Sequence, residues 1–232
     1  MPFPQIENLR AAADRCAHEL GGMDFVIAGA AGNFVASIEN LSSNAFKTVM
    51  DIDAVGTFNT IKATMPHLLR SRSPRIIYMS ATFYFTGMPL QAHASAAKSS
   101  VDSLMASVAL EYGPRGVTSN VISPGGITGT EGLNRLESVD EHERVQYARQ
   151  IPSGRLGTVR DVADATVFLL SDAGSYINGQ VLAVDGAAWR RQGAIGVGID
   201  QSMKYPDFLL DGQTSSGVKE SRGGDQIDKP KL

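Results

Sequence analysis

The carboxylate of Asp53 occupies a position where an apolar side chain is expected. Apolar residues recur at helical spacing around it, at Phe46, Val49, Met50, Phe58, Ile61 and Met65. Asp53 follows Val49 by four residues and Met50 by three, so all three share one face of a helix. Burying a carboxylate is costly unless it is paired or hydrogen-bonded, which makes Asp53 a candidate functional residue. The alternative is a structural carboxylate that accepts hydrogen bonds from backbone amides.

Lys98 lies on the inward face of a second expected helix, three residues before Val101 and seven before Met105. An ordinary solvated lysine is not expected on such a face. The alternative is a side chain whose aliphatic stem packs inward while its ammonium group reaches solvent. Together with Asp53, Lys98 would form an acid–base and orienting pair.

The remaining chemistry-bearing residues predict no metal site. His18, His67, His93 and His142 show no paired metal-ligand spacing. Cys16 is the only cysteine, which excludes an internal disulfide framework and a cysteine-rich metal site and fits a reducing compartment.

Composition excludes two classes of partner. A net charge of -3 leaves no basic footprint, which argues against a nucleic-acid partner. The uninterrupted apolar stretches stay under about ten residues, whereas a membrane helix needs roughly 20, so no membrane span is predicted. The first residues, MPFPQIENLR, do not resemble a secretory signal.

The elements that must position Asp53 and Lys98 follow an alternating pattern of short apolar runs and longer helical stretches. This pattern is typical of a parallel sheet with helices on both faces. The expected strands are Asp24–Ala30, Arg75–Ala81, Thr118–Ser123 and Gln180–Asp185, and the expected helices are Ile6–Leu20, Asn44–Leu69, Gln91–Tyr112, Val139–Gln150 and Val159–Leu170. In the third helix an apolar stripe from Val101 to Tyr112 predicts packing on the sheet. Residues 1–200 are therefore expected to form one domain, and residues 201–232, rich in Gly, Ser and charge, a largely disordered tail.

Five motifs occur in the order that a known family shows. They are AGAAG (Ala28–Gly32), DIDAVGTF (Asp51–Phe58), IIYMSAT (Ile76–Thr82), HASAAK (His93–Lys98) and SPGGITGTEG (Ser123–Gly132). Together they resemble the short-chain dehydrogenase/reductase family, from about Arg10 to Trp189. Within it, AAGNF (Ala30–Phe34) followed by NAFKTVMDID (Asn44–Asp53) is similar to the peroxisomal 2,4-dienoyl-CoA reductases. The resemblance implies a Rossmann-like, doubly wound α/β fold, the cofactor NADPH, reduction of 2,4-dienoyl-CoA in β-oxidation, and a homo-oligomer.

The departures from the general family pattern point to the same subgroup. Members that reduce ketones carry a Tyr and a Ser where this chain has Ala94 and Ala81, and an Asn where it has Asp53. A carbonyl reducer needs an acid at the developing alkoxide, and those hydroxyl groups are absent. The resemblance implies that a water held by Asp53 and Lys98 protonates carbon instead. Tyr84 is a further candidate acid, but its register relative to Lys98 differs from that of the tyrosine-bearing mitochondrial branch.

Other roles are carried over from the resemblance at matched positions. Expected cofactor contacts are Ala31, Gly32, Lys98, Pro124, Gly125, Gly126, Ile127, Thr128, Gly129 and Thr130, and expected acyl-CoA contacts are Phe34, Ser42, Ser43, Asn44 and Arg135. For Pro124 and the glycines that follow, the alternative is a plain strand-ending turn.

The family's glycine-rich turn, which places the pyrophosphate at a helix N-terminus, is expected before Met1 together with the first strand–helix–strand units. A sheet without those units would expose an edge and an apolar face. The alternative to the enzyme is therefore a non-catalytic fragment or an oligomerisation partner. The last residues, Lys229 to Leu232, resemble the S-K-L signal read by the peroxisomal import receptor, with the cytoplasm as the alternative location.

Overall fold

The computed structural model describes residues 5–130 and 141–193. All of them belong to one unit, residues 1–195. The expected domain boundary near residue 200, the expected tail 201–232 and the C-terminal signal lie outside the described residues. Those three expectations stay predictions.

The described strands form one parallel sheet in the order β1-β2-β3-β4. They are β1 (Phe25–Ala28), β2 (Arg75–Met79), β3 (Thr118–Pro124) and β4 (Val181–Val184). Parallel neighbours cannot be joined by a tight hairpin, so a helical crossover follows each of the first three strands. All four expected strands are confirmed, although β1, β2 and β4 are shorter than expected at one or both ends.

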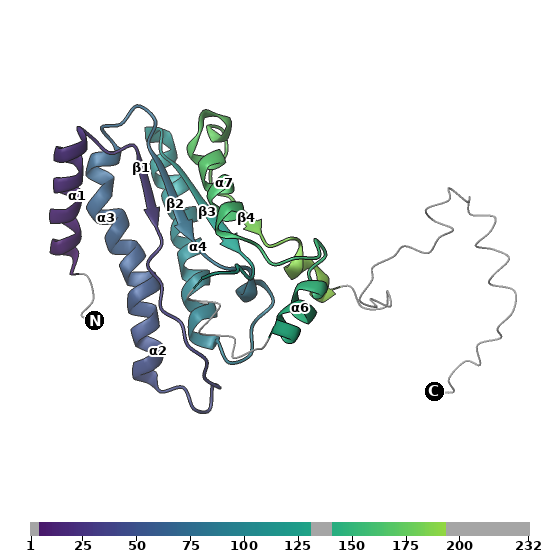
Figure 1. Ribbon diagram of the computed structural model, residues 1–232. Coiled ribbons are helices and arrows are strands. Elements are labelled where there is room, and N and C mark those ends of the chain that lie inside the picture. Colours follow the sequence, from purple (N-terminus) through teal and green to yellow (C-terminus); the bar gives the residue numbers. More distant parts are fainter. Residues whose placement is uncertain (1–4, 131–140, 194–232) are drawn as a thin grey trace, which may run out of the picture. The chain divides into compact units, whose positions relative to one another are not determined.

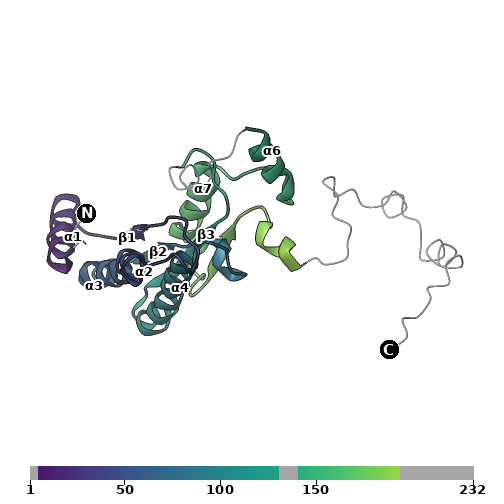
Figure 2. The same ribbon diagram turned by 90° about the horizontal axis from the view of Figure 1, so that it is seen from below.

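Helices cover both faces of this sheet (Figures 1 and 2). They are α1 (Ile6–Leu20), α2 (Ser43–Met50), α3 (Gly56–Leu68), α4 (Ala92–Tyr112), α6 (Glu141–Gln150) and α7 (Val159–Leu170). Figure 2 shows α3 and α4 on one face and α7 on the other, with α1 against the outer side of α3. The predicted Rossmann-like α/β class is confirmed.

Strand β2 explains why its sequence reads as a continuous apolar run. Ile76 and Tyr78 pack into the core shared with α3 and α4, whereas Ile77 packs into the core shared with α7. All three are at most 1% exposed. A strand covered on both faces needs apolar side chains at every position, not at alternate ones.

Strand β1 is an edge of the described sheet, and only one of its faces is covered. Val26 and Ala28 are buried against the α3 side, whereas Phe25 and Ile27 on the other face are 50% and 54% exposed. The expected open edge and exposed apolar face are both present in the described part of the chain.

The helix predicted as continuous from Asn44 to Leu69 is interrupted by a π-helical segment, Asp51–Val55, between α2 and α3. The prediction that Phe46 and Phe58 face the core is wrong, since they are 36% and 45% exposed. A π turn contains an extra residue, so the apolar stripe before it and the stripe after it are out of phase. Phe46 also lies in the first turn of α2, which extends beyond the end of β1 in Figure 1.

Helix α7 begins at a capping box. The Thr158 hydroxyl accepts from the backbone N–H of Asp161, and the Asp161 carboxylate accepts from the backbone N–H of Thr158. Arg155 donates to both carboxylate oxygens of Asp161 at 2.8 Å. These donors hold the pKa of Asp161 well below its usual range. These hydrogen bonds therefore fix the residue at which α7 begins, and α7 is the helix that covers the second face of the sheet.

Candidate active site

Asp53 and Lys98 meet inside the protein at the carboxyl end of β2. Their exposures are 0% and 7%. Lys98 Nζ lies 3.1 Å from Asp53 Oδ2 and donates to the carbonyl of Met79, the last residue of β2, also at 3.1 Å. The ammonium group thus turns inward, which excludes the alternative in which it reaches solvent. The structure brings the two predicted residues together, while their catalytic role stays a prediction.

The second carboxylate oxygen of Asp53 binds the loop that follows β1. The backbone N–H of Gly32 donates to Asp53 Oδ1 at 2.7 Å. A Cβ at Gly32 would lie 3.0 Å from Ile52 Cδ1, so this close approach of the loop to the π segment favours a residue without a side chain. The backbone-amide alternative for Asp53 is therefore present as well. One oxygen secures the loop and the other faces Lys98.

The π segment places Asp53. It spans Asp51–Val55, and Asp53 is its central residue and its only buried one. Single π turns inside helices occur frequently at functional sites, because the extra residue turns a side chain that regular helix would place elsewhere. This local irregularity sets the carboxylate between the loop after β1 and Lys98 of α4.

Buried polar atoms without a hydrogen-bond partner gather around this pair. Among the described residues they include Ser123 Oγ and Asp53 Oδ2, whose contact with Lys98 is an ion pair; the Ser80 hydroxyl has only a weak contact with Asp102, and the His93 ring only one with the Phe34 backbone. Ser80 directly follows β2, and Ser123 lies at the end of β3. Native proteins satisfy nearly all such atoms, and exceptions mark positions that receive water or a ligand. In a parallel α/β sheet, ligands bind at the carboxyl ends of the strands, where these atoms lie.

Tyr84 donates its hydroxyl proton to a carboxylate, whereas a catalytic acid must offer its proton to the substrate. It lies in the 3₁₀ segment Thr82–Phe85, and its hydroxyl donates to the carboxylate of Asp102 on α4. Burial and the Asp102 carboxylate both raise the pKa of Tyr84. The structure therefore gives Tyr84 no support as the proton donor.

His93 belongs to this site, although the sequence argument did not select it. It is 0% exposed, and its ring stacks on Phe34 with centroids 4.1 Å apart. The loop that carries Phe34 is held to the start of α4 by Asn33, whose amide donates to Gln91 at 2.8 Å. A signal was available in the sequence: His93 precedes Ala97 and Val101 at intervals of four, which is the buried face of α4.

The expected cofactor loop, Pro124–Thr130, follows β3 and packs tightly. Gly125 donates to the carbonyl of Val184 at 3.1 Å, and Thr128 donates to the carbonyl of Gly157 at 2.9 Å. A Cβ at Gly125 would lie 2.7 Å from that of Asp185. Packing alone therefore requires glycine at position 125, so the plain-turn alternative stays open and the cofactor role stays a prediction.

The expected acyl-CoA contacts are spread along the site. Phe34 lies beside His93, while Ser42, Ser43 and Asn44 form the exposed start of α2, where the Ser42 hydroxyl accepts from the N–H of Ala45 at 3.1 Å. At 1.5 Å per residue, Ser42 and Asp53 are separated by roughly 15 Å along the helix axis. The structure does not bring these two together, and Arg135 lies outside the described residues.

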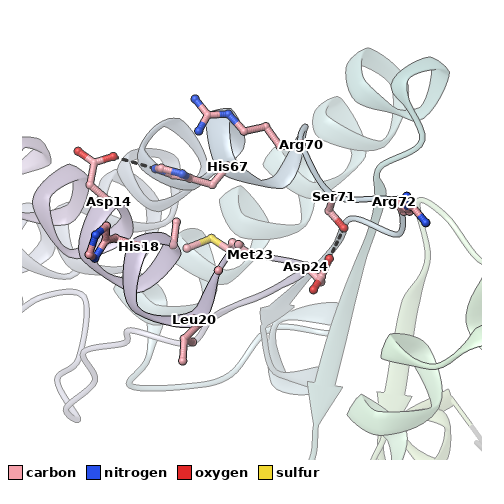
Figure 3. Close-up of a pocket in the computed structure, with 12 residues that line it drawn as sticks. Asp14, His18, Leu20, Met23, Asp24, His67, Arg70, Ser71 and Arg72 are labelled. Carbon is pink, nitrogen blue, oxygen red and sulfur yellow. Dashed lines mark hydrogen bonds and ion pairs between the residues drawn. The ribbon is translucent and has the colours of Figure 1, made fainter.

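A pocket lies at the opposite end of the sheet from the Asp53–Lys98 pair (Figure 3). His67 Nε2 lies 2.8 Å from Asp14 Oδ1, and the Ser71 hydroxyl donates to Asp24, the residue before β1. These polar groups satisfy one another, and the amino end of a parallel sheet is not where such folds bind ligands. This pocket is therefore not the candidate active site.

The described ranges contain no cluster of three or more His, Cys, Asp or Glu side chains arranged to hold a metal ion. None of the helices in those ranges is long and apolar enough to cross a membrane.

Comparison with known proteins identifies relatives across most of the chain. Residues 5–187 match the family model described as enoyl-(acyl carrier protein) reductase. The chain is 45% identical over 213 residues to the peroxisomal 2,4-dienoyl-CoA reductase, (3E)-enoyl-CoA-producing, of Saccharomyces cerevisiae. It is 42% identical over 189 residues to the enzyme of the same description from Danio rerio. These alignments cover 92% and 82% of this chain but 69% and 63% of the relatives, so the chain spans about two thirds of their length.

Solved structures agree with the fold. A short-chain dehydrogenase from Bacillus anthracis superposes with a TM-score of 0.72 at 30% identity, covering 81% of this chain and 74% of that one. The ligand-free aldohexose dehydrogenase of Thermoplasma acidophilum has a TM-score of 0.73 at 24% identity, covering 80% and 75%, and supports the fold alone.

Proposed function

The chain belongs to the short-chain dehydrogenase/reductase family of oxidoreductases, and from that membership we propose that it reduces 2,4-dienoyl-CoA to (3E)-enoyl-CoA with NADPH. The observation that carries the proposal is the buried Asp53–Lys98 pair, with Ala94 and Ala81 at the positions where ketone reducers of the family carry Tyr and Ser. The family implies a nicotinamide cofactor, and the choice of NADPH is part of the proposal.

The two alanines of the site argue against ketone reduction. Ala94 is 2% exposed, so it belongs to the packed interior of the site, and Ala81 directly follows Ser80 at the end of β2. Neither can donate a proton to an alkoxide, and the proton of Tyr84 is engaged by Asp102. A substrate whose negative charge spreads over a conjugated thioester does not need a strong acid at oxygen.

The residues at the carboxyl ends of β2 and β3 fit the nicotinamide end of such a cofactor. Lys98 has three N–H groups and donates one to Met79, while the Asp53 carboxylate, 3.1 Å away, is its ion-pair partner, so N–H groups remain for a ribose hydroxyl and a water. The Ser80 hydroxyl, near Asp102, and the unpaired Ser123 hydroxyl lie at the same ends of the strands. The loop Pro124–Thr130 would complete the cofactor contacts. When bound, the reduced nicotinamide supplies a hydride.

The chain's own residues then have the task of handling a proton. Hydride addition at C5 of the dienoyl thioester moves an electron pair into a dienolate whose charge lies on the thioester oxygen. A water held by Asp53 and Lys98 donates a proton to C2, which leaves hydroxide beside the Lys98 ammonium, and the hydroxide regains a proton from solvent. The electrostatic contribution of Lys98 is large because the pair is buried, where charges interact more strongly than in water.

Location and assembly are part of the same proposal. The curated relatives are peroxisomal by name, which supports a peroxisomal protein that an import receptor delivers and that acts in β-oxidation. A homo-oligomer is supported by apolar side chains on the outer side of the α3 region, where Val55 and Phe58 are each 45% exposed. Exposed apolar groups gathered in this way mark interaction surfaces.

The activity is tested with the 232-residue chain and NADPH, whose absorbance falls as it is oxidised. Turnover of 2,4-hexadienoyl-CoA without turnover of simple ketones is the expected result. Turnover of ketones alone would contradict the proposal. If neither substrate is turned over and NADPH titration shows no saturable binding, the non-catalytic alternative replaces it. For location, a fluorescent protein fused before Met1 should enter peroxisomes, and removal of Pro230–Leu232 should leave it in the cytosol.

A further inference from the structure

His93 is the residue of the site whose chemistry the proposed function does not yet use. It lies on α4 directly before Ala94 and is 0% exposed. One ring nitrogen has only a weak contact with the Phe34 backbone, and the other has no hydrogen-bond partner. A buried imidazole nitrogen left without a partner opposes folding. In native proteins such atoms are satisfied by a bound water or a ligand.

The ring is held in one orientation. It stacks on Phe34 with an interplanar angle of 21° and a centroid distance of 4.1 Å. Two contacts hold the Phe34 loop against the start of α4: the Asn33 amide donates to Gln91 at 2.8 Å, and Ala36 donates to the carbonyl of Leu90 at 2.9 Å. A ring clamped in this way is suited to orient whatever it binds.

The surroundings set which form of the ring is present. Burial lowers the pKa of His93, and the Phe34 backbone and the Asp53 carboxylate offset that effect only in part. The neutral ring carries one N–H donor and one nitrogen acceptor. Phe34, on which the ring stacks, follows Gly32 by two residues, and the Gly32 N–H binds Asp53, so the ring and the carboxylate contact the same loop.

We propose that His93 is a positioning residue for the proton-donating water of the Asp53–Lys98 pair, and that it directs the proton to C2 of the dienolate. This inference rests on the proposed function. The water accepts a hydrogen bond from Lys98, which Asp53 holds in place, and donates one hydrogen to the unprotonated ring nitrogen of His93. Its other hydrogen then points at the substrate. As the O–H bond breaks, a C2–H bond forms with the electron pair of the dienolate, and hydroxide remains beside Lys98.

Orientation of the water decides the product. The dienolate carries electron density at C2 and at C4, so protonation at C2 yields a 3-enoyl thioester and protonation at C4 yields a 2-enoyl thioester. A water that binds Lys98 alone can turn either hydrogen toward the substrate, whereas a second bond, to His93, fixes which hydrogen is donated. Loss of His93 should therefore change the product ratio as well as the rate.

The first measurement is the position of the double bond in the product. The 232-residue chain and its His93→Phe, His93→Gln and His67→Gln variants are given NADPH and 2,4-hexadienoyl-CoA, and the products are analysed by NMR. Phe retains the stack on Phe34 without the nitrogens, whereas Gln retains a donor and an acceptor. His67 lies in the pocket at the amino end of the sheet, so its substitution is the matched control. We expect His93→Phe to lower the rate about tenfold, as for one lost hydrogen bond to a reacting group, and to release 2-enoyl product. His93→Gln should restore part of the selectivity.

The second measurement needs no cofactor. A 3-enoyl-CoA loses a C2 proton to form the same dienolate, so the chain should exchange C2 hydrogens with D₂O, and His93→Phe should slow this exchange about tenfold. Unchanged exchange and unchanged product ratio in His93→Phe would overturn this inference alone, provided that the wild-type chain is active. Absence of both reactions from the wild-type chain would overturn the proposed function and this inference with it. Equal losses in His67→Gln and His93→Phe would show a general loss of structure and contradict a specific role.

Discussion

Substitution of Lys98 by Met should destabilise the protein more than the loss of an exposed ion pair would. The variant keeps a similar side-chain volume but leaves the Asp53 carboxylate, which is 0% exposed, with only the Gly32 N–H at 2.7 Å as a partner. Removing one member of a buried ion pair costs about 3–5 kcal/mol, because the remaining charge is neither solvated nor paired. This loss corresponds to a rise in the unfolded population of roughly a hundred- to several-thousand-fold.

Urea unfolding measures this loss. The chain has a single tryptophan, Trp189, whose ring lies edge-on to Phe85, so its fluorescence reports the folded state. Lys47→Met is the matched control, since Lys47 pairs with Asp51 on the same helical segment but its side chain is 70% exposed. That variant should lose less than about 1 kcal/mol.

A double variant separates the charge from the packing. Lys98→Met combined with Asp53→Asn keeps an acceptor for the Gly32 N–H but removes the buried charge. It should recover most of the lost stability, since neutral replacements of buried pairs are often well tolerated, yet it should remain inactive. Equal midpoints for Lys98→Met and wild type, or no recovery in the double variant, would refute the reasoning that the two charges stabilise each other in the folded state.

Three further outcomes are expected. Gly125→Ala should destabilise the protein by about 1–3 kcal/mol in the same unfolding assay, because its Cβ would lie 2.7 Å from that of Asp185. Gly56→Ala should be neutral or stabilising by up to about 1 kcal/mol, because a Cβ at this position of α3 would lie 3.7 Å from its nearest neighbour, the carbonyl oxygen of Asp51. The opposite order would contradict the packing argument. Because the pKa of Asp161 is lowered, its carboxylate contributes fully to stability above about pH 4, and this contribution is lost as the pH falls through its folded-state pKa. The free energy of unfolding of Asp161→Asn should therefore differ from that of wild type at neutral pH and equal it at low pH. A difference that stays constant with pH would exclude this linkage. Phe58→Asp should convert the proposed oligomer to a smaller species in light scattering after size exclusion, while an unchanged mass would remove Phe58 from the interface.

Local periodicity was enough to predict most elements of the fold. Alternating apolar runs and helical stripes placed all four described strands and the bounds of α1 and α7, because the burial pattern of a strand or helix is written in neighbouring residues. The same periodicity put Asp53 and Lys98 on inward faces, and their burial agrees. Motif order identified the family, since several short motifs in a conserved sequence order are far more specific than any single one.

Tertiary structure decided what those residues meet. The π segment at Asp51–Val55 is not visible in a helical pattern, because it depends on how the helix fits against the loop after β1 and against α4, and it put Phe58 on the surface instead of in the core. The partners of Asp53 come from two separate segments, Gly32 after β1 and Lys98 on α4, and the second of these also carries His93. The spacing of a polar residue in the sequence indicates that it is buried, but only the folded structure shows whether its hydrogen bonds are satisfied. That is why Asp53 was predictable as a buried carboxylate, while the incompletely hydrogen-bonded imidazole of His93 emerged only from the structure.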